Sequence, residues 1–147
     1  MDLTLIKIRK AIEQDYKYCY RLTKINMLGY FTKYWGGWKS ENFLKNFNHS
    51  ETNIILKNDR RIGYYVIKNK SDYYYLDNIQ ISPLMKGKWI GSFIMKLIEE
   101  QIIKTKANII RLEVFKDNPA KKLYERFDYK IIKDNWASVL MEKILSK

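Results

Sequence analysis

A basic, glycine-containing turn between a strand-like run and a helix-like run is the feature that most constrains this chain. Residues 73–81, YYYLDNIQI, predict a strand, and residues 90–103 place apolar side chains at the i, i+3, i+4 spacing of a helix. The turn between them carries Lys86 and Lys88 on either side of Gly87. Because the first N–H groups of a helix lack intrahelical acceptors and the helix dipole is positive there, this turn is predicted to bind phosphate.

Two common nucleotide-binding loops are excluded at this turn. The GxxxxGK[ST] pattern of nucleoside-triphosphate loops is absent from the chain. The dinucleotide fingerprint, GxGxxG after a first strand with an acidic residue about 20 positions later, is absent as well. The ligand is therefore expected to carry phosphate but to belong to another class.

The turn resembles the pyrophosphate loop of the GNAT superfamily of N-acetyltransferases, V-x-P-x-x-[QR]-x-x-G-x-[GA]. Ile81 and Pro83 stand for the valine and the proline, and Gly91 stands for the last glycine. Lys86 stands at the Gln/Arg position and carries a positive charge. Trp89 replaces the glycine that lets backbone approach the pyrophosphate. Its N–H stays usable if its φ is negative, with the side chain pointing away from the ligand.

A second segment resembles the same family, in which a strand ending in L-x-V leads to N-P-A-x-x-L-Y-E-[RK]-x-G-F. Residues 118–120 and 123–126 match this pattern, and proline stands at the first helical position. Asp128 replaces the family glycine, and aspartate tolerates the left-handed conformation better than most residues. Tyr129 replaces the final aromatic. Specific residues support the resemblance from about 76 to 129, and the element order supports it over the whole chain.

The expected elements follow the family order. Strands are expected at residues 3–9, 52–57, 61–68, 73–81, 109–115, 129–133 and 138–144. Helices are expected at residues 14–28, 40–47, 90–103 and 119–127. Ser40 is the expected cap of the second helix, residues 58–60 a hairpin turn, and residues 29–39 a loop rich in aromatics. The resemblance implies an α/β (α+β) fold with a central mixed, mostly antiparallel sheet of about seven strands flanked by four helices, in the order β-α-α-β-β-β-α-β-α-β-β.

Bulk composition agrees with one globular, cytoplasmic domain spanning residues 1–147. Hydrophobic residues make up 46% of the chain, and no apolar run reaches the length of a membrane span. The first residues lack the apolar core of a signal peptide, and no membrane partner is expected. The lone Cys19 excludes an intrachain disulfide, and one cysteine with one histidine argues against a metal site.

The net charge of +12 comes from 28 basic and 16 acidic residues. The lysines are spread from Lys7 to Lys147 rather than clustered. A nucleic-acid partner is one interpretation of such a charge. A lysine-rich composition, together with the positive potential that polyanionic coenzyme A needs, is the interpretation we favour.

The resemblance implies acetyl-coenzyme A as the cofactor. In the family, the strands corresponding to residues 73–81 and 109–115 splay apart, and the pantetheine arm pairs with strand backbone as an added strand would. The Ile81 N–H would face the thioester oxygen, a contact worth about 2.7–4 kcal/mol. Asn118 would hydrogen-bond the pantetheine arm. A plain N-cap before Pro119 is the alternative interpretation, and the two roles do not exclude each other. The implied cofactor-binding residues are Ile79, Gln80, Ile81, Lys86, Gly87, Lys88, Trp89, Ile90, Gly91, Ser92, Asn118, Lys121 and Tyr124.

Tyr124 is the predicted general acid, because a phenol with an ordinary pKa near 10 can protonate a departing thiolate. A tyrosine packed on the core is the alternative interpretation. Asp77 and Glu113 are the candidate bases for the amine proton. Asp77 shares the parity of Ile79 and Ile81, so it is expected on a covered face with a raised pKa. A plain strand acid, with ordered water as the base, is the alternative.

The acceptor amine is expected beside the aromatic loop at residues 29–39. Glycines between two tryptophans permit a tight turn that presents aromatic rings, which hold amines by cation–π and apolar contact. The predicted substrate-binding residues are Tyr34, Trp35, Trp38 and Trp136. A hydrophobic lid over the core is the competing interpretation.

These features predict an N-acetyltransferase that moves an acetyl group from acetyl-coenzyme A to a primary amine by direct attack in a ternary complex. Two other interpretations stay open: a toxin-like acyltransferase acting on charged tRNA, and an inactive GNAT-fold module that binds acyl-coenzyme A. The acceptor is expected to be a small-molecule or peptide amine. The protein is expected to be a monomer or a homodimer.

Overall fold

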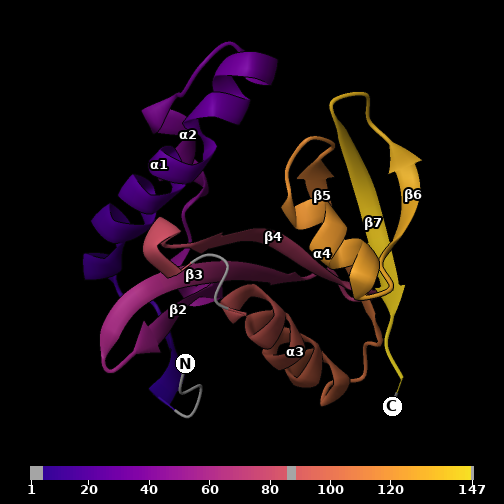
Figure 1. Cartoon of the computed structure of the whole chain (residues 1–147). Coiled ribbons are helices and arrows are strands. Elements are labelled where there is room, and N and C mark those ends of the chain that lie inside the picture. The colour runs from indigo at the N-terminus through magenta and orange to yellow at the C-terminus, as the bar shows by residue number, and fades with distance from the viewer. Residues whose placement is uncertain (1–4, 86–88, 147) are drawn as a thin grey trace. The chain divides into compact units, whose positions relative to one another are not determined.

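The computed structural model describes residues 5–85 and 89–146, which Figure 1 draws in colour. Its strands are β1 (Ile6–Lys10), β2 (Thr52–Lys57), β3 (Arg60–Asn69), β4 (Tyr74–Ile81), β5 (Ile109–Phe115), β6 (Lys130–Asp134) and β7 (Ser138–Ile144). Its α-helices are α1 (Tyr16–Trp35), α2 (Ser40–Asn46), α3 (Ile90–Ile103) and α4 (Ala120–Arg126). Short 3-10 turns lie at Glu13–Asp15, His49–Glu51 and Pro83–Met85.

The described strands form a 7-stranded sheet in the order β1-β2-β3-β4-β5-β7-β6. β1 with β2, β2 with β3, β5 with β7 and β6 with β7 are antiparallel, whereas β4 and β5 are parallel. Parallel neighbours need a crossover connection, and α3 supplies it between β4 and β5. The mixed, mostly antiparallel sheet with helices in the implied order is confirmed.

The parallel ladder between β4 and β5 is short. Residues 74–76 pair with residues 110–112, whereas β4 continues to Ile81 and β5 to Phe115. On its other edge, β5 pairs with β7 along its whole length.

α1 is longer than expected, and the loop predicted at residues 29–39 is wrong over residues 29–35. The helix passes the expected end at Leu28 and continues through Gly29 to Trp35. An interior glycine costs a helix about 1 kcal/mol relative to alanine, a weak preference that side-chain contacts override. Here Phe31 stacks on Trp35 one helical turn later, with ring centroids 4.7 Å apart.

The tight turn predicted at the glycine pair is confirmed, but it lies directly at the end of α1. Gly36 and Gly37 have φ values of 77° and 128°, which is backbone that glycine adopts without strain. The predicted cap at Ser40 is wrong. Ser40 is the first helical residue of α2, and its Oγ lies 2.8 Å from the Tyr20 hydroxyl instead of capping the helix.

Most other boundaries lie close to those expected. α4 begins one residue later than predicted, because Pro119 precedes its first helical residue. The hairpin between β2 and β3 turns at Asn58 and Asp59, whose φ values of 51° and 63° fit a tight two-residue hairpin turn. Asp128, which replaces the family glycine, has a φ of 68° and confirms that aspartate accepts the left-handed conformation there.

The chain consists of two compact units, residues 1–66 with 78–88 and residues 67–77 with 89–147. The core of the first unit contains Ala11, Cys19, Leu22, Ile54 and Tyr64. In the second unit, α3 buries Ile90, Ile94, Met95, Ile98 and Ile102. That the chain acts as one domain stays a prediction. None of the helices in the described part of the chain combines the length and apolar character that a membrane crossing requires.

Candidate functional site

The end of β4 is anchored to β3 within the first unit. The Ser82 N–H donates to the Ile62 carbonyl at 2.8 Å. A Cβ on Gly63 would collide with the Gln80 carbonyl, so glycine allows the two backbones to approach closely. Successive strand residues direct their N–H groups to opposite edges, so the Ile81 N–H points to the edge away from β3. This edge suits a ligand that adds itself as a strand.

Two polar side chains join the end of β4 to α1, and one of them, Asn26, is absent from the predicted site. Gln80, a predicted cofactor-binding residue, is 7% exposed. Asn26, on α1, donates from Nδ2 to Gln80 Oε1 and to the Ile81 carbonyl, both at 3.0 Å. These partners lie 54 and 55 positions from Asn26, and no local pattern marks such a pair.

α3 begins after a residue in the left-handed conformation. Trp89 has a φ of 68° and a ψ of 5°, and it is 80% exposed. Use of its N–H is predicted only for a negative φ, and this condition is not met. Trp89 holds a conformation that glycine adopts freely and that costs other residues roughly 1–2 kcal/mol. The predicted contacts of Lys86, Gly87 and Lys88 lie outside the described residues.

The first turn of α3 presents backbone N–H groups. The Phe93 N–H donates to the Trp89 carbonyl at 3.1 Å, so the N–H groups of residues 90–92 precede the first internal bond of the helix. A Cβ on Gly91 would lie 3.3 Å from the Leu123 side chain of α4. Gly91 therefore lets α3 and α4 pack closely, whether or not it also faces a ligand.

Asn118 lies where the loop after β5 leads into α4. Its Oδ1 accepts from the Ala120 N–H at 3.0 Å, which confirms the capping interpretation. Its side-chain nitrogen has two donor hydrogens that this bond does not use, so a second role is compatible with the cap. Lys121 forms an ion pair with Glu125 at 3.4 Å, one helical turn later.

Tyr124 lies inside α4 and is only 6% exposed. Its ring centroid is 5.8 Å from that of Tyr129, so it packs in an aromatic pair. Burial raises the pKa of Tyr124 to about 12. The phenol therefore keeps its proton at neutral pH, as a general acid must, and the packed-core interpretation describes its surroundings as well.

Asp77 lies on the open face of β4. The strand buries even-numbered residues such as Leu76 and Gln80, which are 3% and 7% exposed. The Asp77 side chain is 41% exposed and lies 3.7 Å from the Lys68 ammonium. The covered face predicted for Asp77 is therefore wrong, because its odd parity directs it away from the buried side of the strand.

Glu113, the second candidate base, is exposed on β5. It accepts hydrogen bonds from Ser138 Oγ at 2.5 Å and from Asn135 Nδ2 at 3.1 Å. Tyr75 interacts electrostatically with both acids. Burial and then the charges of Glu113 and Asp77 raise the pKa of Tyr75 to about 12. Tyr75 is absent from the predicted site, although its parity with Asp77 is a signal that could have indicated it.

The predicted acceptor-binding aromatics of the first unit lie at the end of α1 and just after it. Tyr34 and Trp35 occupy its last turn, and Trp35 is 62% exposed. Trp38 donates from Nε1 to the Tyr20 hydroxyl at 3.1 Å and stacks on Phe31, with ring centroids 5.4 Å apart. The rings of Phe31, Trp35 and Trp38 form one aromatic cluster at the end of α1, which is compatible with an acceptor wall and with a hydrophobic lid.

Trp136 lies in the turn between β6 and β7 of the second unit. Its φ is 73° and it is 80% exposed. The main-chain N–H of Trp136 donates to Asp134 Oδ1 at 2.9 Å. The Asp134 carboxylate also forms an ion pair with Lys116 at 2.8 Å. These two interactions stabilise the turn of the hairpin. That Trp136 binds an acceptor stays a prediction.

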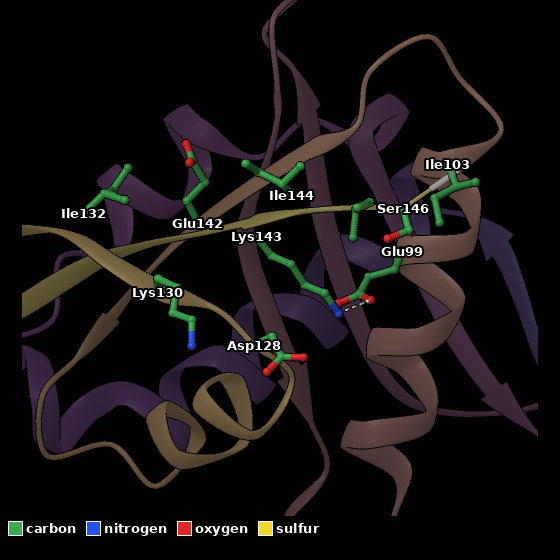
Figure 2. A pocket seen from close by; sticks show the side chains of 10 residues that line it. Glu99, Ile103, Asp128, Lys130, Ile132, Glu142, Lys143, Ile144 and Ser146 are labelled. Carbon is green, nitrogen blue, oxygen red and sulfur yellow. Dashed lines mark hydrogen bonds and ion pairs between the residues drawn. The ribbon is translucent and has the colours of Figure 1, made fainter.

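A pocket of about 600 Å³ lies in the second unit (Figure 2). It is lined by Glu99, Ile103, Asp128, Lys130, Ile132, Glu142, Lys143, Ile144, Leu145 and Ser146. Glu99 and Lys143 form an ion pair at 2.8 Å, and the Tyr129 hydroxyl donates to the same glutamate at 2.9 Å. Since no predicted site residue lines this pocket, we do not assign it to the cofactor.

Comparison with known proteins gives the same family as the two motifs. A family model described as an acetyltransferase (GNAT) domain matches residues 33–138. No curated protein matches the sequence significantly. The ribosomal-protein-S18-alanine N-acetyltransferase from Escherichia coli has a similar structure, with a TM-score of 0.76, 16% identity, and coverage of 97% of this chain and 95% of that chain.

Two further solved structures share the fold. Ard1 from Thermoplasma volcanium has a TM-score of 0.74 and 15% identity, over 97% of this chain and 99% of that chain. The PaiA N-acetyltransferase from Thermoplasma acidophilum, solved in complex with coenzyme A, has a TM-score of 0.72 and 16% identity, over 98% of this chain and 99% of that chain. The family model covers more than half of the chain and contains both motif segments. The chain therefore belongs to the GNAT acetyltransferase family.

Proposed function

We propose that this protein is an N-acetyltransferase that moves an acetyl group from acetyl-coenzyme A to a primary amine by direct attack in a ternary complex. The observation that carries the proposal is the match of residues 33–138 to the acetyltransferase domain. That span contains the end of β4, the first turn of α3, Asn118 and Tyr124. We propose that these four features bind coenzyme A or take part in acetyl transfer.

The described residues fit coenzyme A at one place in each unit. In the second unit, the N–H groups of residues 90–92 and the positive end of the α3 dipole suit a pyrophosphate. Asn118 there has a side-chain donor for an amide of the pantetheine arm. In the first unit, the edge of β4 that carries the Ile81 N–H suits an added strand. The relative from Thermoplasma acidophilum was solved with coenzyme A, which supports this choice of cofactor.

Acetyl-coenzyme A would supply an acetyl group activated as a thioester. The Ile81 N–H would donate to the carbonyl oxygen, where negative charge grows as the amine attacks, a contribution of about 2.7–4 kcal/mol. As the new N–C bond forms and the C–S bond breaks, Tyr124 would give its proton to the departing sulfur. Its pKa of about 12 keeps the proton on the phenol until that moment.

The amine must also lose a proton. We propose that it leaves through water to Asp77 or Glu113, since both carboxylates are exposed and neither is enclosed by protein. Asp77→Asn and Glu113→Gln variants test each acid in turn. A pH–rate profile that stays unchanged in both variants would assign this step to water alone.

The acceptor class is open to direct measurement. The relative from Escherichia coli is named for an alanine of ribosomal protein S18, so peptide α-amines belong in a screen beside small amines. Tyr34, Trp35, Trp38 and Trp136 are the side chains proposed to hold the acceptor. Their rings offer apolar and cation–π contact to an ammonium group.

The deciding experiment has two stages. The first is a thermal-unfolding titration with acetyl-coenzyme A, in which ligand at a hundred times its Kd adds about 2.7 kcal/mol of stability. The second measures release of free thiol over an amine panel. Cys19 does not disturb that signal, because it is fully buried and burial raises the pKa of its thiol to about 12. Binding with amine-dependent thiol release supports the proposal, and binding without it favours an inactive acyl-coenzyme A module.

A further inference from the structure

A chain of hydrogen bonds joins α1 to the end of β4 within the first unit. Asn26 Nδ2 donates to Gln80 Oε1 and to the Ile81 carbonyl, both at 3.0 Å. Gln80 Nε2 donates to Asn78 Oδ1 at 2.8 Å. Asn78 Nδ2 donates to the Tyr64 hydroxyl at 2.8 Å. These hydrogen bonds therefore run from α1, along the buried side of β4, to β3.

The far end of the chain fixes its direction. The Thr23 hydroxyl donates to the Cys19 carbonyl at 2.7 Å, which uses its only proton. Thr23 therefore accepts from the Tyr64 hydroxyl, its second partner, while Tyr64 accepts from Asn78. Every donor points the same way, from Asn26 to the Cys19 carbonyl, and aligned hydrogen bonds strengthen one another.

Burial keeps this arrangement in place. Gln80, Thr23 and Tyr64 are 7%, 3% and 1% exposed. A buried polar group that loses its partner costs about 1–3 kcal/mol, so no member can turn over without a penalty. Asn26 donates from Nδ2 to two separate oxygen atoms, and flipping its amide would place an oxygen against both of them.

The consequence falls on one peptide unit. Asn26 donates to the carbonyl of the Ile81–Ser82 peptide, and the N–H of the same peptide donates to the Ile62 carbonyl at 2.8 Å. Both ends of that peptide are therefore held, one by α1 and one by β3. Ile81 also carries, on its preceding peptide, the N–H proposed to face the thioester oxygen. Fixing one peptide plane of Ile81 limits the rotation of the other.

We propose that Asn26 is a positioning residue for acetyl transfer, which orients the Ile81 main chain and so the N–H that stabilises charge on the carbonyl oxygen. This inference rests on the proposed function. It goes beyond the family motifs, because Asn26 lies on α1 and outside both of them. Misplacing a catalytic contact by about 1 Å costs about 10²-fold in rate, which sets the size of the expected effect.

Asn26→Asp tests the inference with an almost unchanged side-chain shape. It replaces both donors by an acceptor that faces two oxygen atoms. We expect kcat to fall on the order of 10²-fold, while the Kd of free coenzyme A stays close to that of the wild type. Asn26→Ala removes the amide without adding charge and provides a second variant in case Asn26→Asp does not fold.

Thr52→Val is the matched control. Thr52 is fully buried in the first unit, and its hydroxyl donates to the Asn48 carbonyl at 2.7 Å, outside the chain of bonds. Losing that bond should cost about 1 kcal/mol and lower Tm without lowering kcat. Wild-type kcat in the Asn26 variants, or an equal loss of kcat in Thr52→Val, would overturn the positioning role.

A measurement without turnover separates this inference from the proposed function. In the protein without ligand, Asn26→Ala should shift the Ile81 and Ser82 amide resonances and speed hydrogen exchange at Ser82, whereas Thr52→Val should not. Unchanged resonances would overturn the anchoring of this peptide. If the resonances shift but the wild type transfers no acetyl group to any amine, the proposed function fails and takes the catalytic role of Asn26 with it.

Discussion

The main-chain oxygen of Gln80 occupies the space that a Cβ on Gly63 would need. The Ile81 Cα lies 3.2 Å from that Cβ position. The backbones of β3 and β4 therefore come so close here that only glycine fits. The need is steric rather than conformational, since Gly63 is not among the residues with positive φ. This close approach lies beside the Ile81 N–H and contributes to fixing the end of β4.

Gly63→Ala is expected to destabilise the protein by about 1–3 kcal/mol, because the backbone must shift to admit the methyl group. The shift should also lower kcat for acetyl transfer. Gly29→Ala is the control, since a Cβ there meets nothing within 4 Å. In the interior of α1 it should add up to about 1 kcal/mol of stability. Urea unfolding of both variants tests this, and equal stabilities would contradict it.

Tyr124→Phe is expected to lower kcat by about 10²–10⁴-fold, the range for loss of a general acid, with little change in the Kd of coenzyme A. Tyr129→Phe is the matched control from the same aromatic pair. It removes the 2.9 Å hydrogen bond to Glu99 and should lower Tm while leaving kcat unchanged. A Tyr124→Phe enzyme with full kcat would return Tyr124 to the packed-core interpretation.

The pH dependence gives a second test of Tyr124. An ordinary tyrosine loses its proton near pH 10, but burial raises the pKa of Tyr124 to about 12. The protonated, active form therefore persists above pH 10. We expect no fall in kcat between about pH 8 and 10, and a fall centred near pH 10 would show that the general acid is a different, unburied group.

Much of the fold could be predicted because its signals are local. The spacing of apolar residues at 90–103 predicts α3, and the Asn-Pro-Ala step predicts the start of α4 within one residue. The end of α1 could not be read locally. Gly29 resembles a helix stop, but the stacking of Phe31 on Trp35 outweighs its small cost.

The candidate site was less predictable than the fold. The motif segments placed Asn118 and Tyr124 in the elements where they are found. The left-handed backbone of Trp89 has no signal in its residue type, since glycine is the residue that adopts this conformation without strain. The bonds of Asn26 join positions far apart in sequence, and such pairs have no periodicity or motif to indicate them.

Trp89→Gly and Trp136→Gly should each stabilise the protein by up to about 1 kcal/mol. Both residues have left-handed backbone, with φ of 68° and 73°, and both are 80% exposed, so little packing is lost. Only Trp89→Gly should also tighten coenzyme A binding, because it lies at the start of α3 and glycine lets a pyrophosphate approach. Thermal-unfolding titrations of both variants test this. Weaker binding in Trp89→Gly would show instead that its ring contacts the ligand.

Asp15 forms a buried ionic cluster in the first unit. It is 2% exposed, and its carboxylate accepts from Arg9 at 2.7 and 3.0 Å and from Arg61 at 3.1 Å. The Arg9 hydrogen bonds outweigh the opposing effect of burial and lower the pKa of Asp15 from 3.8 to about 2. A depressed pKa in the folded state means that the carboxylate stabilises the protein above pH 3.8, and that this contribution is lost as the pH falls through about 2.

Asp15→Asn is therefore expected to lower stability most at neutral pH. The shift corresponds to about 2 kcal/mol of pH-dependent stability, and the two unpaired arginines add a pH-independent loss. Urea unfolding at pH 7, 4 and 3 should show the gap between wild type and variant narrowing as the pH falls. Asp134→Asn, at a side chain that is 64% exposed, is the control and should change stability little. A gap that stays constant with pH would show that the Asp15 carboxylate is not held below its ordinary pKa.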